Sequence, residues 1–75
     1  MYPLMGMTFR QFRNSIGATL REVAEATGTS EPTLSRFERD LHSPLGPLML
    51  RLVDWAERER RQRRLPDSYR VDWAA

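Results

Sequence analysis

The chain has 75 residues, one histidine and no cysteine. A core of this size is only marginally stable, and neither a disulfide framework nor a cysteine or histidine metal site can reinforce it, so we expect no metal and no cofactor. No apolar stretch reaches the roughly 20 residues of a membrane span. The first seven residues also lack the basic leader of a signal peptide, so we expect a cytoplasmic protein without membrane contact.

The charge is modest in sum but uneven along the chain. The formal net charge is +2, the sequence pI is about 9.9, and every basic residue is an arginine. Arginine is concentrated in the run RERRQRR at residues 58–64. Two interpretations stay open: a solvated helix end whose cations complement the helix dipole, or a set of phosphate contacts.

Residues 1–7 are expected to be irregular, because Pro3 and Gly6 both disfavour a helix. A first helix begins after a cap at Thr8 and ends at Gly17. Its apolar residues recur at helical spacing: Phe9, Phe12 and Ile16.

A second helix begins after Thr19, and Glu22 three residues later completes a capping box. Its apolar positions include Val23 and Ala24, and Gly28 ends it. Ser30 caps a third helix, whose inward face is formed by Leu34, Phe37 and Leu41.

The turn-rich stretch HSPLGP, residues 42–47, precedes a fourth helix, and Pro47 suits its first turn. One apolar stripe runs along it: Leu48, Leu52, Trp55 and Ala56. Helix-favouring residues continue to Arg64 after the stripe stops, so the helix either projects from the domain or is covered by another segment. The tail YRVDWAA, residues 69–75, alternates apolar and polar residues, which predicts an extended segment.

The corner between the second and third helices is tight. Ala24 permits a close crossing, and Gly28 adopts the left-handed conformation at low cost. Two helices held at roughly 90–120° through such a turn leave the second one protruding. A protruding helix fits the major groove of DNA.

Residues 9–57 resemble the Cro/C1-type (XRE) helix-turn-helix family of bacterial and phage regulators. The resemblance is carried by GATLREVAEATGTS (17–30), TLSRFERD (33–40) and LMLRLVDWA (48–56). It implies an all-α, lambda repressor-like bundle of four to five helices with an extended C-terminal tail. Residues 8–57 would form the DNA-binding domain, and residues 58–75 an arginine-rich helix extension with an aromatic tail.

The sequence departs from the family pattern at three places. Leu20 stands where the family often has a glutamine that reaches phosphate, and Arg21 is the candidate substitute. Pro32 removes a donor from the first turn of the third helix. Gly46-Pro47 replaces a more usual helix start.

With the third helix in the major groove, the expected base contacts are Glu31, Pro32, Ser35 and Arg36. For three of them a structural role stays open: Arg36 pairing with Asp40, Glu31 complementing the helix dipole, and Pro32 stiffening the first turn. The expected phosphate contacts are Arg10, Arg13, Thr19, Arg21, Ser30, Thr33, Arg39, His42 and Ser43. Glu38 is expected to pair with an arginine instead.

We therefore expect a non-enzymatic regulator, a repressor, that binds double-stranded operator DNA as a homodimer and takes no small-molecule substrate. Dimer or partner contacts are expected at Trp55, placed half in the core and half at an interface, and in the tail at Tyr69, Val71 and Trp73, because exposed aromatic side chains there otherwise lack a packing partner. The alternative is a protein-interaction module on the same fold, such as a small antitoxin or adaptor, that binds its partner through the tail. A MerR-like or excisionase-type module fits less well, because no wing strands follow Asp40.

Overall fold

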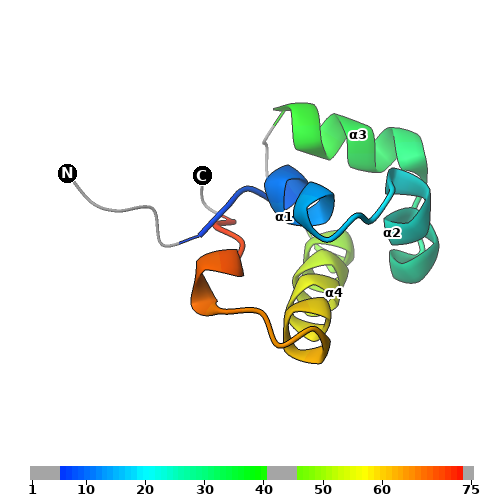
Figure 1. Cartoon of the computed structure of the whole chain (residues 1–75). Helices are drawn as coiled ribbons and strands as arrows, with labels where there is room; N and C mark the ends of the chain where they lie inside the picture. Colours follow the sequence, from blue (N-terminus) through cyan, green and yellow to red (C-terminus); the bar gives the residue numbers. More distant parts are fainter. Residues whose placement is uncertain (1–5, 41–45, 74–75) are drawn as a thin grey trace.

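The computed structural model describes residues 6–40 and 46–73. Its elements are α1 (Phe9–Ser15), α2 (Leu20–Thr27), α3 (Glu31–Asp40), α4 (Pro47–Gln62) and a single 3₁₀ turn, η1 (Asp67–Tyr69). Helix α3 lies across one end of the bundle, and α4 runs away from that end (Figure 1). The expected all-α class is confirmed for the described residues.

The predicted helix starts are confirmed. Thr8 caps α1 and Thr19 caps α2, each in a capping box in which the side chain at the third helical position bonds back to the cap backbone. Gly17 and Gly28 follow α1 and α2 with φ of 74° and 73°. Since this left-handed region is costly for residues with a Cβ, the two glycines end their helices at little cost.

The core is one cluster to which every helix contributes. Phe12, Val23, Leu34 and Leu52 are fully buried. Of the expected core residues, Phe37 and Leu48 are only partly buried and pack against the edge of this cluster. The small side chain of Ala24, 4% exposed, lets α2 lie close to its neighbours.

Helix α4 ends at Gln62, two residues before the predicted Arg64. Arg64 has a positive φ of 54°, and the N–H of Leu65 donates to the carbonyl of Arg60 at 3.0 Å. This is the pattern in which a glycine usually stands, so an arginine closes α4 where glycines close α1 and α2.

The C-terminal tail returns to the start of α1 instead of extending away. Residues 67–69 form η1, so the extended conformation predicted for residues 69–75 is wrong at Tyr69. Val71 then pairs with Met7 in a parallel β-bridge. The Met7 N–H donates to the Arg70 carbonyl at 2.8 Å, and the Asp72 N–H donates to the Met7 carbonyl at 2.8 Å.

The aromatic residues assigned to a dimer contact have packing partners in their own chain. Trp55 is 9% exposed and belongs to the core. Tyr69, Val71 and Trp73 are partly buried and pack against that core. The premise that Tyr69, Val71 and Trp73 lack a packing partner is therefore wrong, because the tail folds back onto α1.

Candidate nucleic-acid interface

Helix α3 divides into a buried side and an exposed side. Leu34 is fully buried and Phe37 partly buried. Of the four expected base-contact residues, Glu31, Pro32 and Arg36 are exposed and Ser35 is half-buried. The anchoring of α3 through its apolar side therefore leaves those side chains accessible to a ligand.

The N-terminus of α3 is capped as expected. The Thr33 N–H donates to the Ser30 hydroxyl oxygen at 3.3 Å, and that hydroxyl donates to the Thr33 hydroxyl oxygen at 2.9 Å. Pro32 lies in the first turn, where its missing N–H would have no partner within the helix. Both hydroxyl residues are exposed, so the cap sits at the surface.

Two exposed arginines, Arg36 and Arg39, lie in the C-terminal half of α3. Neither forms an ion pair with another residue whose side chain is described. The alternative pairing of Arg36 with Asp40 concerns a side chain outside the described part of the structure. An arginine fork in this situation can donate two parallel hydrogen bonds to a guanine edge or to phosphate.

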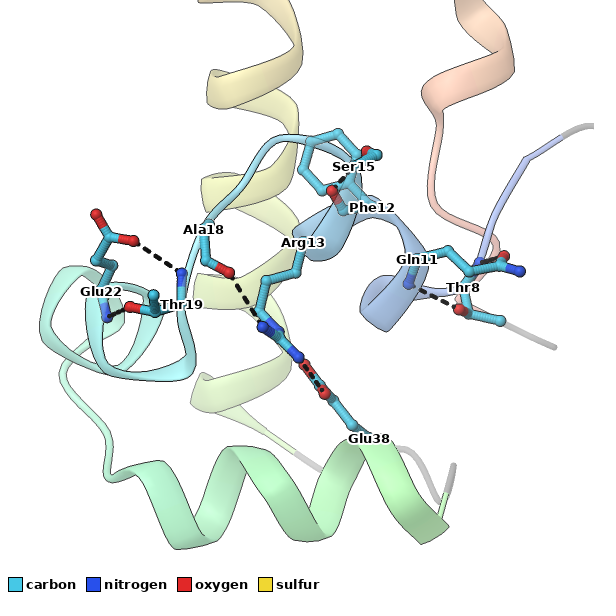
Figure 2. A network of polar contacts seen from close by, with 9 residues as sticks. All are labelled: Thr8, Gln11, Phe12, Arg13, Ser15, Ala18, Thr19, Glu22 and Glu38. Atoms are coloured by element: carbon cyan, nitrogen blue, oxygen red, sulfur yellow. Dashed lines mark hydrogen bonds and ion pairs between the residues drawn. The ribbon is translucent and has the colours of Figure 1, made fainter.

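Arg13 lies in the interior of the bundle, contrary to its expected contact with phosphate. Its Nε donates to Glu38 Oε2 at 2.6 Å and its Nη2 to Glu38 Oε1 at 2.9 Å. Its Nη1 donates to the Ala18 carbonyl at 3.0 Å. Figure 2 shows this side chain reaching from α1 to the Glu38 carboxylate on α3.

The Arg13–Glu38 pair is shielded, with side chains 11% and 5% exposed. The expected pairing of Glu38 with an arginine is thus confirmed. Because both carboxylate oxygens and three guanidinium donors are satisfied, the pair fixes α3 against α1 and removes one acidic charge from the surface.

The remaining expected phosphate contacts are dispersed over the first two helices. Arg10 is exposed and lines a cavity of about 190 Å³ together with Phe37 and Glu38, which places it beside the C-terminal half of α3. Arg21 is exposed and lies 3.7 Å from the Glu25 carboxylate in an open surface pair. His42 and Ser43 lie outside the described residues.

Thr19 uses its polar groups inside the capping box of α2. Its hydroxyl accepts from the Glu22 N–H at 3.0 Å, and its own N–H donates to the Glu22 carboxylate at 2.8 Å (Figure 2). The hydrogen bond from this backbone N–H lowers the pKa of Glu22 below its usual value. The Thr19 N–H is therefore already committed within the protein.

The arginine-rich end of α4 lies far from α3 along the α4 axis (Figure 1). Several of its cations are in ion pairs: Arg60 with Glu57 at 2.9 Å, and Arg63 with Glu59 at 3.0 Å. The hydrogen bond from Arg60 holds the pKa of Glu57 below its usual value. These pairs show that part of the run neutralises its own helix.

Two functional features were not foreseen from the sequence. One is the inward position of Arg13. Its partner Glu38 lies 25 residues away in the sequence, and no rule based on short sequence spacing connects two such residues. The other is the docking of Trp73 on Phe9, with ring centroids 5.7 Å apart. The alternation of apolar residues in the tail indicated a side that needs a partner but not which one.

The described parts of the chain contain neither a metal-binding group nor a membrane-spanning helix. Residues 6–40 and 46–73 contain no group of three or more histidine, cysteine, aspartate or glutamate side chains placed to hold a metal ion. In the same ranges no helix is long and apolar enough to cross a membrane.

Comparison with known proteins assigns the fold to a family. A family model described as a helix-turn-helix domain matches residues 4–72. No curated protein and no solved structure matched the chain. The match covers nearly the whole chain and includes α2, α3 and the exposed face of α3, which indicates a DNA-binding regulator. The chain belongs to the Cro/C1-type (XRE) helix-turn-helix family.

Proposed function

We propose that this protein is a sequence-specific regulator of transcription, a repressor, that binds double-stranded operator DNA as a homodimer. Helix α3 enters the major groove, and Arg36 reads bases together with Glu31, Pro32 and Ser35. The observation that carries the proposal is the exposed face of α3, held out by Leu34 and the Arg13–Glu38 pair, in a chain of the helix-turn-helix family.

The small number of cations supports the dimer. Residues 19–40 contain three arginines and five carboxylates, and one of those carboxylates is neutralised by Arg13. Phosphate contacts supply most of the salt-dependent affinity for DNA. With Arg10, Arg21 and Arg39 as its cationic phosphate contacts, one copy would bind weakly, and two copies on adjacent half-sites would double the number of contacts.

The test is selection of bound duplexes from a random pool, followed by titration of the selected site at several salt concentrations. A two-fold symmetric consensus is expected, with a slope of log K against log salt of about −5 for six phosphate contacts. No enrichment, or an affinity independent of salt, would refute the proposal.

Arg36→Ala is the variant that probes base readout. It should weaken binding to the selected site by about 1–3 kcal/mol and leave binding to random duplex nearly unchanged. Arg61→Ala is the matched control, because it removes an exposed arginine at the end of α4 remote from α3 (Figure 1). An equal loss on both duplexes would make Arg36 a phosphate contact.

A second candidate is a protein-interaction module on the same fold. The excess of carboxylates over arginines in residues 19–40 favours it, since a segment of net negative charge repels phosphate. Its partner would bind the C-terminal tail, as in a small antitoxin or adaptor. Stoichiometric co-purification of a partner that is lost on deletion of residues 66–75, together with no enriched duplex, would establish this candidate in place of the first.

A further inference from the structure

Phe9 is the centre of an aromatic cluster that joins three separate parts of the chain. Its ring centroid lies 5.7 Å from Phe37 on α3, 5.8 Å from Trp55 on α4 and 5.7 Å from Trp73 in the tail. Phe9 is 5% exposed, so the surrounding rings cover it almost completely. Tilted rings at these separations attract one another beyond the area they bury.

Phe37 is the point at which this cluster touches the DNA-reading helix. It lies between Arg36 and Arg39, the two exposed arginines of α3, and its ring is only partly buried. The packing of the Phe37 ring therefore helps to hold the stretch of α3 that carries both arginines. The Arg13–Glu38 pair ties the same stretch of α3 to α1, but through polar contacts.

The position of Trp73 is fixed by the β-bridge between the two ends of the domain. Two backbone hydrogen bonds of 2.8 Å join Met7 to Arg70 and Asp72. The approach is so close that a Cβ on Gly6 would lie 2.2 Å from the Arg70 carbonyl oxygen. Only glycine fits there, so the bridge holds the tail against α1 in one register.

The space beside the cluster shows why the tail matters for α3. A cavity of about 190 Å³ is lined by Phe9, Phe37, Val71 and Trp73. Phe37 therefore borders this cavity on the side that faces the tail. Trp73 is connected to Phe37 through Phe9, which lies next to both rings. Without Trp73, Phe9 would lose one of the three rings that surround it.

We propose that Trp73 is a positioning residue for α3: seated by the Met7–Val71 bridge, it holds Phe9 against Phe37 and so fixes the C-terminal half of the reading helix. The proposal deepens the proposed function and rests on it for its consequence on DNA binding. It gives the tail a role inside its own domain and requires no partner protein.

The experiment is amide hydrogen exchange of the full chain without DNA, followed residue by residue by NMR. Trp73→Ala should speed exchange at residues 35–39 of α3, relative to residues 23–27 of α2, on the order of tenfold, because local opening of α3 becomes easier. Trp73→Phe should restore most of the protection. Gly6→Ala disturbs the β-bridge but leaves every aromatic ring in place, and it should reproduce the faster exchange in α3. It replaces Trp73→Ala in the experiment if that variant does not fold.

Leu65→Ala is the matched control. Leu65 also packs against the core from beyond α4, but it is not part of the ring cluster around Phe9. Leu65→Ala should raise the amide exchange rates in α2 and in α3 by the same factor. If Trp73→Ala and Gly6→Ala also raised both helices equally, the tail would only stabilise the whole domain and the proposal would be overturned.

DNA binding separates this proposal from the proposed function. On the selected duplex, and corrected for the folded fraction, Trp73→Ala should weaken binding on the order of tenfold. Faster exchange in α3 with unchanged affinity would overturn the part of the proposal that concerns DNA binding. If the wild-type chain bound no duplex, the proposed function would fail, whereas the exchange pattern would still decide whether Trp73 holds α3.

Discussion

Replacing Arg13 by methionine is the sharpest test of how α3 is held. The change leaves an unbranched apolar side chain, shorter than arginine, and removes three hydrogen bonds, two to Glu38 and one to the Ala18 carbonyl. It leaves the Glu38 carboxylate, 5% exposed, without a partner. Breaking a buried pair from one side costs about 3–5 kcal/mol, and the 11% exposure of Arg13 places the expected loss near the lower end, about 3 kcal/mol.

That loss is large for a domain of this size. At about 0.05–0.15 kcal/mol per residue, the whole chain is stable by about 4–11 kcal/mol. Thermal unfolding followed by circular dichroism should therefore show a fall in Tm of about 12–24 °C for Arg13→Met. Urea titration at 25 °C gives the free energy directly.

The double variant Arg13→Met with Glu38→Leu separates the contribution of the ion pair to stability from the cost of burying one unpaired charge. Because no unpaired charge remains, it should recover most of the stability lost by Arg13→Met. A loss below about 1 kcal/mol for Arg13→Met would show that the pair behaves as a solvated surface contact. The reasoning about the attachment of α3 would then be refuted.

Two further predictions concern helix ends. Arg64→Gly should raise the free energy of unfolding by about 1 kcal/mol, because glycine adopts the φ of 54° found at Arg64 without the steric cost of a Cβ. Urea titration measures this free energy. Equal or lower stability of the variant would argue against this description of the end of α4. The pKa of Glu22 is lowered in the fold, so its carboxylate contributes stability above its unfolded pKa, and that contribution is lost as the pH falls through the folded pKa. Glu22→Gln should therefore be less stable than wild type near neutral pH, and the difference should shrink as the pH falls through the folded pKa of Glu22. A difference independent of pH would rule out this role.

The sequence determined the local structure of this protein. Thr8, Thr19 and Ser30 cap their helices as expected, and Gly17 and Gly28 end theirs, because a cap depends on a side chain and a backbone group a few residues apart. Helical spacing likewise identified the most buried residues, such as Leu34 and Leu52. These features together indicated the all-α fold and an exposed third helix.

The tertiary structure decided what joins segments distant in sequence. Arg13 meets Glu38 and Trp73 meets Phe9 across 25 and 64 positions, and no local pattern distinguishes an arginine that faces solvent from one that faces a buried carboxylate. The apolar residues of the tail indicated that one side of it packs against another surface. Its composition, however, is equally compatible with packing on a second copy of the chain and with packing on its own core. The choice between those surfaces is made by packing and loop closure, and here the close approach at Gly6 brings the tail back onto α1.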